Sequence, residues 1–258
     1  MGKGLSQKVG DTFRVSLNLY SMQKLRKIYE GKAKIVYETE EPDKVILEFK
    51  DTATAFDGTK KETVEGKGSL NNEISSILFT ILENHGIKTH FIKKLSEREM
   101  LVWKAKRFPL ELVVRNYAAG SFVKRYGVEE GTEINPPLVE FFLKNDELHD
   151  PMVCEEHIKF LNLAPIELLP EMKKIGLKVN EILKNLFEKA NILLVDFKLE
   201  FGLLPDGSLG VVDEISPDGM RLWDKETKER LDKDRFRFDL GDLLEGYKKV
   251  LLNLKNVV

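Results

Sequence analysis

Three ionisable side chains alternate with apolar ones in the segment Asn191–Gly202. Asp196, Lys198 and Glu200 are each two residues apart, with Phe197 and Leu199 between them. Side chains two apart in a β-strand share a face, so this spacing predicts a strand that buries one face and presents acid, base and acid on the other. Three consecutive ionic positions indicate a candidate site; the alternative interpretation is a charged strand face in water.

The residues that follow predict a divalent cation site. Residues 205–207 (Pro-Asp-Gly) are a hairpin signal, and residues 209–215 form a second short apolar segment. If the hairpin folds about the Asp-Gly bond, Glu200 faces Asp213 across the two strands. Two opposed carboxylates repel each other unless a cation lies between them, and Mg²⁺ takes one or two carboxylates plus phosphate oxygens. A bulge would shift this register by one, and a solvated charged hairpin is the alternative.

Two lysines in the N-terminal half could bind phosphate. Lys32 and Lys34 follow Gly31, which separates two predicted short strands within residues 24–37. A glycine between strands lets the backbone approach a ligand closely, and two lysines on one face can neutralise phosphate oxygens. Lysines on an exposed hairpin are the alternative interpretation.

A second anion-binding pattern occupies residues 110–127. A predicted buried strand, 110–114, runs into Arg115, and the small residues 118–121, ending in Ser121, open a short helix. Free N–H groups at a helix start can bind an anion, and an arginine can add a forked contact. A capped helix with Arg115 in a salt bridge is the alternative.

The elements that must position these residues follow from hydrophobic periodicity. Apolar spacing predicts helices over 70–82, ended by Gly86, over 155–191 and over 240–254. Further strands are predicted at 45–50, 88–94 and 99–106, and residues 128–151 are predicted to be rich in loops. This order indicates an α+β protein with a small antiparallel N-terminal lobe and a larger mixed C-terminal lobe. We therefore expect the site in the cleft between a lobe of residues 22–106 and one of residues 107–258.

Composition excludes several classes of protein. The chain has 258 residues, a net charge of −2 and one cysteine, so nothing general points to nucleic acid or an anionic membrane as partner and no internal disulfide can form. No apolar run approaches the ~20 residues that cross a bilayer, and there is no signal-peptide pattern, so we expect a cytoplasmic protein. Residues 1–21 differ in character from the rest: either Met22 is the biological start, or this leader is peripheral.

Four segments of the chain together resemble one known family. They are Tyr29–Tyr37, Val113–Ser121, Leu194–Gly202 and Asp213–Asp224. In this order they resemble the phosphoribosylaminoimidazole-succinocarboxamide synthase (SAICAR synthetase) family of purine biosynthesis, over about residues 24 to 254. The resemblance implies a two-lobed, ATP-grasp-like or kinase-like fold with magnesium in the cleft. It also implies that ATP is cleaved to ADP and phosphate while the carboxylate of carboxyaminoimidazole ribonucleotide (CAIR) is joined to the amine of L-aspartate, through an acyl phosphate.

The resemblance also implies roles for individual residues at the nucleotide end. Lys32 and Lys34 match lysines that hold ATP phosphates, and Glu200 and Asp213 match magnesium-binding acids. Lys198 would lie between the nucleotide and the CAIR carboxylate, where it stabilises charge on the transferred phosphoryl group.

At the substrate end the resemblance implies a second group of residues. Arg115, Ser121 and Arg221 match residues that bind the phosphate and carboxylate of CAIR. The remaining matches are Lys144, near the reacting groups, and three acids. Asp196 and Asp218 fall in the catalytic group and Asp57 in the substrate-binding group, without a finer individual role. The leader is the main departure from the family pattern.

Two rival interpretations come from the same residues. A protein-kinase-like phosphotransferase is suggested by Asp196-Phe197, but Lys198 replaces the glycine of Asp-Phe-Gly, and the His-Arg-Asp and Gly-x-Gly-x-x-Gly motifs are missing from the sequence. A nucleotide-binding regulator without chemistry would leave the second anion site unexplained. We further expect a homo-oligomer, with a dimer as the working hypothesis.

Overall fold

The computed structural model describes residues 22–258, apart from the side chain of Asp57. The predicted leader, residues 1–21, and the question of a start at Met22 therefore lie outside the described residues. None of the helices in the described part of the chain is long and apolar enough to span a membrane.

The N-terminal lobe is built on a five-stranded antiparallel sheet with strand order β1-β2-β3-β7-β6. Its strands are β1 (Lys27–Glu30), β2 (Lys34–Glu38), β3 (Lys44–Phe49), β6 (Phe91–Lys94) and β7 (Glu99–Trp103). Helix α1 (Lys67–Asn84) packs on this sheet through Ile74, Leu78 and Leu82, which are fully buried. A separate hairpin of β4 (Thr52–Ala55) and β5 (Lys60–Thr63) encloses the 3-10 turn η1 (Phe56–Gly58).

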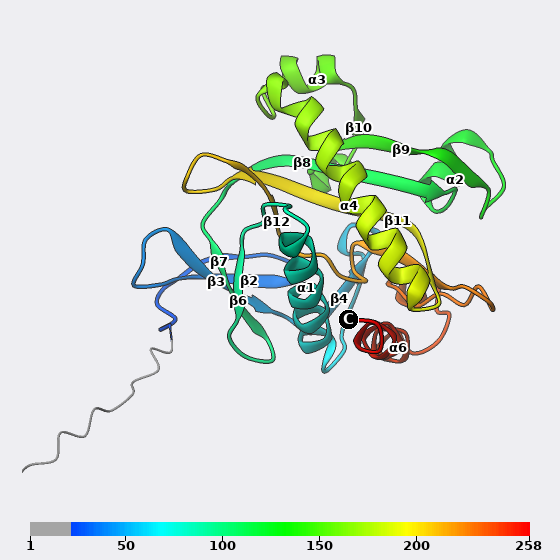
Figure 1. Cartoon of the computed structure of the whole chain (residues 1–258), viewed down its shortest axis with the longest axis horizontal. Coiled ribbons are helices and arrows are strands. Elements are labelled where there is room, and N and C mark those ends of the chain that lie inside the picture. Colours follow the sequence, from blue (N-terminus) through cyan, green and yellow to red (C-terminus); the bar gives the residue numbers. More distant parts are fainter. Residues whose placement is uncertain (1–21) are drawn as a thin grey trace, which may run out of the picture.

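The C-terminal lobe is built on a six-stranded sheet with β11 at its centre (Figure 1). Strand β11 (Ile192–Leu203) pairs with β8 (Lys106–Tyr117) on one side, and with β12 (Leu209–Val212) and β13 (Met220–Asp224) on the other. Strands β9 (Glu133–Leu143) and β10 (Met152–Val153) continue the sheet beyond β8. Helix α4 (Leu169–Lys189) crosses one face of the sheet, so the opposite face is left for the ionic side chains of β11.

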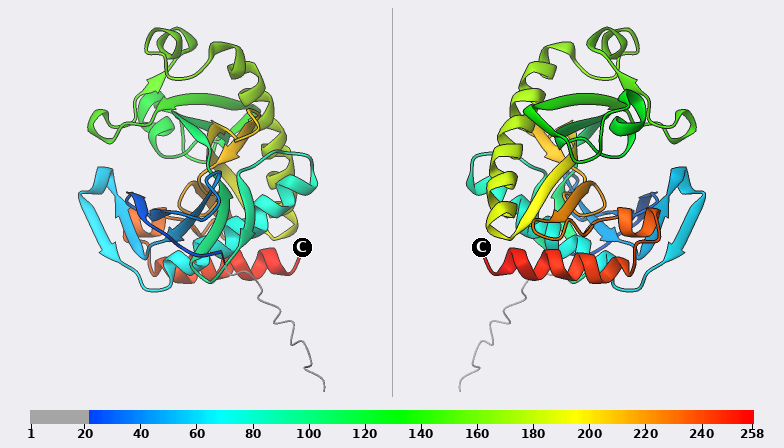
Figure 2. Two further views of the ribbon diagram at one scale, coloured as in Figure 1. Left: turned by 90° about the vertical axis from the view of Figure 1, so that its left-hand side faces the viewer. Right: turned by 90° about the vertical axis from the view of Figure 1, so that its right-hand side faces the viewer.

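The last helix returns to the N-terminal lobe. Helix α6 (Leu243–Lys255) lies against α1, as the two views of Figure 2 show. Its residues Leu243 and Tyr247 share a small core with Phe236 of α5 (Asp234–Arg237) and with Ala53 and Ala55 of β4. The short helix α2 (Ser121–Tyr126) and the turn η2 (Asp146–Leu148) lie in connections of the C-terminal lobe. These observations confirm the predicted α+β, two-lobed fold, while the boundary between residues 106 and 107 stays a prediction.

Two of the predicted elements are wrong. Residues 128–151, predicted as loop, contain the 11-residue strand β9. Its two prolines, Pro136 and Pro137, follow a cis Asn135–Pro136 bond and fall where the β8–β9 register shifts, beyond the part of β9 that pairs with β10. A proline is tolerated there because no neighbouring strand needs its missing N–H group.

The helix predicted over 155–191 is interrupted. The structure has α3 (Glu155–Phe160), an irregular segment, the 3-10 turn η3 (Ile166–Leu168) and then α4. The break has two local causes: Asn162 adopts a left-handed conformation with φ 50°, and Pro165 disfavours a helical conformation in the residue before it.

Candidate active site

The central strand carries its three ionic residues on one face, as predicted. Asp196, Lys198 and Glu200 lie opposite Arg115, Val113 and Glu111 of β8, respectively. Asp196 is 4% exposed and Glu200 is 2% exposed, so the alternative of a charged face in water is wrong. A buried charge must be paired, and each of these carboxylates has at least two cationic partners.

The predicted opposition of Glu200 and Asp213 is wrong by one residue. Glu200 pairs with Val212, because the loop between the strands has an odd number of residues and centres on Asp206 rather than on the Asp-Gly bond. Asp213 instead follows the end of β12 in a left-handed conformation, with φ 71°. The two carboxylates are still neighbours, since Arg107 of β8 reaches Glu200 at 2.5 Å and Asp213 at 3.5 Å.

Lysines from both lobes surround this acid pair. Lys34 of β2 lies 3.2 Å from Asp213 and 2.5 Å from Glu214. These two ion pairs join the N-terminal sheet to the end of β12. Lys144, just beyond β9, forms an ion pair with Glu200. Burial raises the pKa of Asp213, but Lys34, Lys144 and other nearby cations outweigh it, so the net pKa lies well below the ordinary range. Asp213 is therefore ionised at neutral pH.

Lys198 is held as a permanent cation. Its ammonium group lies 2.5 Å from Glu111 and 3.6 Å from Glu200. Burial lowers the pKa of Lys198, but the carboxylates of Glu111 and Glu200 outweigh that effect and raise the pKa above its ordinary value. Lys198 can therefore stabilise negative charge throughout a reaction, but it is a poor proton donor at neutral pH.

A second cluster lies at the other end of the same strand face. The Asp196 carboxylate accepts hydrogen bonds from Arg115 at 2.9 Å and from Arg221 of β13 at 3.0 Å. Arg115 also binds Glu140, at 2.6 Å, and is 3% exposed. The alternative interpretation is therefore right about the salt bridges of Arg115, but α2 has no side-chain cap. Arg221, whose side chain is 18% exposed, is the more accessible of the two guanidinium groups.

Gly120 brings the chain before α2 close to Arg221. A Cβ atom at position 120 would lie 2.2 Å from Nη2 of Arg221, and the backbone has φ 56°. Only glycine fits there, so Arg221 packs directly on the backbone that opens α2 at Ser121. Ser121 and Arg115 together line a cavity of about 450 Å³.

Asp218 lies where the two lobes meet. Its carboxylate binds Lys67 of α1 at 2.6 Å and the hydroxyl of Tyr247 of α6 at 2.5 Å. Burial raises its pKa, but Lys67 and then Lys233 outweigh burial and lower the pKa well below the ordinary range. A permanently ionised Asp218 can hold cations in place, and it ties the loop before β13 to two helices of the N-terminal side.

One candidate residue, Lys32, lies apart from these clusters, and the side chain of another, Asp57, is not described. Lys32, on the turn between β1 and β2, pairs with Asp146 of η2 at 2.7 Å and is not joined to Glu200 or Asp213 by a direct contact. Asp57 lies on η1, and its side chain is outside the described residues.

Comparison with known proteins agrees with this geometry. The family described as SAICAR synthetase matches residues 27–254. The chain belongs to the SAICAR synthetase family. It is 76% identical over 208 residues to the phosphoribosylaminoimidazole-succinocarboxamide synthase of Aquifex aeolicus, covering 81% of this chain and 96% of that protein.

Solved structures of the family share the fold. The crystal structure of the phosphoribosylaminoimidazole-succinocarboxamide synthase from Ehrlichia chaffeensis matches with a TM-score of 0.87 and 50% identity, over 90% of this chain and 99% of that one. A SAICAR synthetase in complex with ADP matches with a TM-score of 0.85 and 52% identity, over 88% of this chain and 97% of that one.

The acid pair of this SAICAR synthetase family member fits a magnesium ion only together with a ligand. Within residues 22–258, no three His, Cys, Asp or Glu side chains are grouped so that they could hold a metal by themselves. Glu200 and Asp213 supply oxygen ligands from two residues, which is the number Mg²⁺ takes when phosphate oxygens complete its shell. The donor set therefore fits magnesium that arrives with a nucleotide.

Several residues of the clusters were not found from the sequence. Arg107 and Glu111 belong to β8 and have the same parity as Arg115, so the alternation rule applied to 106–117 would have found them. Lys67 and Tyr247 carry no comparable signal, because each is one polar residue in an otherwise ordinary amphipathic helix. Only the packing of α1 and α6 brings them to Asp218.

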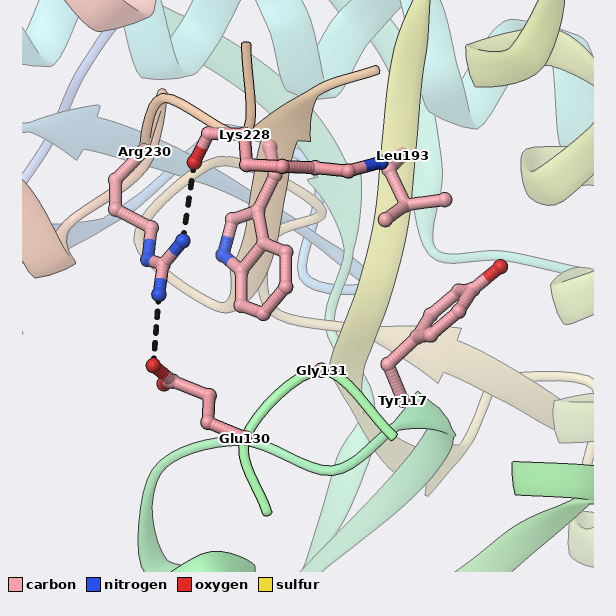
Figure 3. A pocket seen from close by; sticks show the side chains of 7 residues that line it. Tyr117, Glu130, Gly131, Leu193, Lys228 and Arg230 are labelled. Atoms are coloured by element: carbon pink, nitrogen blue, oxygen red, sulfur yellow. Dashed lines mark hydrogen bonds and ion pairs between the residues drawn. The ribbon is translucent and has the colours of Figure 1, made fainter. Parts of the chain in front are cut away.

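A separate cavity of about 320 Å³ contains none of the candidate residues (Figure 3). Tyr117, Leu193 and Trp223 line it, and Arg230 lies 3.9 Å over the ring of Trp223. Arg230 is also paired with Glu130 at 2.8 Å. The Arg230 guanidinium of this family member therefore has both a carboxylate and an aromatic partner at this cavity.

Proposed function

We propose that this chain is a phosphoribosylaminoimidazole-succinocarboxamide synthase, which condenses CAIR with L-aspartate and converts ATP to ADP and phosphate. The observation that carries the proposal is the ionic face of β11. It links a lysine and carboxylate cluster at Lys34, Glu200 and Asp213 to an arginine cluster at Arg115 and Arg221. A ligase of this kind needs two anion sites on either side of one reacting centre, and Lys198 stands between them.

The nucleotide would bind at the Glu200 end of this face, where Lys34 of the N-terminal lobe reaches Asp213. Lys34 and Lys32 would contact the phosphates, and the ADP complex of a related SAICAR synthetase supports a nucleotide site in this fold. Glu200 and Asp213 would hold magnesium, which supplies charge neutralisation of the phosphates when it is bound. The cationic partners of the acid pair keep both carboxylates ionised and therefore ready for this role.

Lys198 would stabilise the phosphoryl group during its transfer to CAIR. A carboxylate is a poor electrophile, so its oxygen first attacks the γ-phosphorus of ATP, and the bond to ADP breaks to leave an acyl phosphate. The amine of L-aspartate then attacks the acyl carbon, the bond to phosphate breaks and the amine loses a proton. Such transfers require alignment and charge stabilisation more than covalent help from the protein, which suits a permanent cation held by Glu111.

Arg221, Arg115 and Ser121 would bind the phosphate end of CAIR. Asp196 holds both guanidinium groups at fixed positions, which reduces the entropy lost when the substrate binds. Lys144, paired with Glu200, would lie near the CAIR carboxylate. We assign Asp57 to the substrate site and Asp218 to the reacting centre as proposals of the same kind.

The test is product formation from the purified protein with CAIR, L-aspartate, ATP and Mg²⁺, omitting each component in turn. SAICAR should form only in the complete mixture, with one ADP for each SAICAR. Steady phosphorylation of an acceptor other than CAIR would favour the phosphotransferase interpretation instead. ATP binding without any turnover would favour the nucleotide-binding regulator.

We also propose a cytoplasmic homodimer that binds neither nucleic acid nor membrane. Light scattering on the purified chain would give about twice the 29.6 kDa mass of one chain for a dimer, and a mass near 29.6 kDa would contradict it.

A further inference from the structure

One lysine of the site region has no close partner. Lys233 directly precedes α5, and its N–H group donates to the carbonyl of Pro217 at 3.3 Å, which ties it to the loop that carries Asp218. Its side chain is 15% exposed, and its nearest carboxylate, Asp218, is 4.0 Å away. The two oxygens of Asp218 already accept shorter hydrogen bonds from Lys67 and Tyr247. Among the side chains that the structure describes, which do not include Asp57, no acceptor therefore comes within hydrogen-bond distance of the Lys233 ammonium group.

Lys233 shares its nearest carboxylate with a closer ammonium group. Lys67 binds Asp218 at 2.6 Å, and Lys233 lies 4.0 Å from the same carboxylate. Burial lowers the pKa of Lys233 to about 8; Asp218 and Glu214 oppose this, and Lys67 and Arg237 add to it. A buried cation without a close acceptor costs free energy, so an anion that enters this space is stabilised by it.

Lys233 is tied to both ends of the proposed site. The residue after it, Asp234, binds Nε of Arg221 at 2.8 Å. On the other side, the loop of Asp218 continues to Gly219, whose carbonyl accepts the N–H of Lys198 at 2.9 Å. Lys233 is thus linked through neighbouring residues both to Arg221, the proposed anchor of the CAIR phosphate, and to the backbone of Lys198.

We propose that Lys233 binds a carboxylate of L-aspartate. This inference rests on the proposed function, in which two of the three substrates already have cationic anchors, ATP at Lys34 and CAIR at Arg221. L-Aspartate brings two carboxylates and has no such anchor among the candidate residues. A cation beside the aspartate amine also favours its unprotonated form, which is the form that attacks the acyl carbon.

The experiment compares Lys233→Met with the wild-type chain and with Lys174→Met as a matched control. Lys174 is an exposed lysine of α4, with a side chain 78% exposed and its nearest carboxylate 3.8 Å away. KM is measured for each substrate, and L-aspartate binding is measured by calorimetry in the presence of ADP. We expect Lys233→Met to raise the aspartate KM and Kd by roughly 10- to 100-fold, the range for one charge-assisted contact, and to change the other two KM values by less than about twofold.

Two further measurements separate binding from folding. Lys233→Met removes no short hydrogen bond, so the Tm of this variant should equal or exceed that of the wild type. Lys233→Arg keeps the charge and should restore part of the affinity. A variant with an unchanged aspartate KM, or one in which only the CAIR or the ATP KM rises, overturns the inference while leaving the proposed function intact. If the wild type binds no aspartate and makes no SAICAR, both fail together; if it makes SAICAR, only the assignment of Lys233 is at stake.

Discussion

Replacing Lys198 by methionine tests the central element of the proposed mechanism. The change removes the only ammonium group on the ionic face of β11, while methionine keeps an unbranched stem where Lys198 packs near Gly219. The loss of one preorganised charge contact typically lowers kcat by 10²–10³, and we expect a fall of about 100-fold, or ~2.7 kcal/mol in the barrier.

The effect on stability should be smaller than the effect on the rate. Glu111 loses its ammonium partner, but the Glu111 side chain is 14% exposed and can recruit water. Glu200 keeps Arg107 and Lys144. We therefore expect the free energy of unfolding to fall by roughly 1 kcal/mol, the lower end of the range for an unpaired buried carboxylate.

The assay is the initial rate of SAICAR formation at saturating ATP, CAIR and L-aspartate, with urea denaturation of the same samples. Lys174→Met serves again as the control and should match the wild type in both. Lys198→Arg keeps the charge with a different shape and should retain more activity than Lys198→Met. A kcat within twofold of the wild type, with a normal unfolding curve, would refute the role of Lys198.

Three further predictions address other parts of the site. Gly120→Ala should raise the CAIR KM at least tenfold and lower the stability by roughly 1–3 kcal/mol, because the new Cβ meets Arg221 and φ is 56°; an unchanged CAIR KM would contradict the close approach. Burial, and then Asp234, raise the pKa of Asp232 to about 7, above the unfolded value near 3.9. The folded state therefore binds the extra proton between about pH 4 and 7, so this group makes stability fall as pH rises through that window; Asp232→Asn should remove that contribution in urea denaturation at several pH values, and an identical slope would contradict it. Chelation of divalent cations should abolish SAICAR formation and weaken ATP binding, while Tm without nucleotide stays constant; turnover that survives EDTA would remove magnesium from the proposal.

The central strand could be predicted because its signal is local. Strand alternation needs only neighbouring residues, and Asp196, Lys198 and Glu200 do share one face of β11. The hairpin register could not be predicted in the same way, because it depends on where the turn closes. Asp206 accepts hydrogen bonds from the N–H and hydroxyl groups of Ser208 and becomes the centre of the loop, which moves Val212 rather than Asp213 opposite Glu200.

Strand β9 was missed because its stability comes from its neighbours. It carries two prolines and two exposed polar residues, Glu133 and Asn135, which are typical of loops in isolation. Residues 138–143 of β9 pair with β8, and this pairing stabilises a strand that the β9 sequence alone does not predict. The helix break after α3, in contrast, had a visible cause in Pro165, and a stricter use of the proline rule would have found it.

The site illustrates the same distinction at the level of chemistry. Residues that lie on a strand face or beside a glycine turn can be recognised from the spacing of their neighbours in the sequence, as Lys34, Lys198 and Arg221 can. Residues that act by meeting another element leave none: Lys67, Lys233 and Tyr247 come from three separate segments and converge only on Asp218. Their convergence requires α6 to return to α1, and that packing is decided by apolar residues such as Leu243, which carry no chemistry themselves. The reacting groups can thus be predicted from the chain one strand at a time, whereas the proposed aspartate contact exists only because the last helix closes the fold.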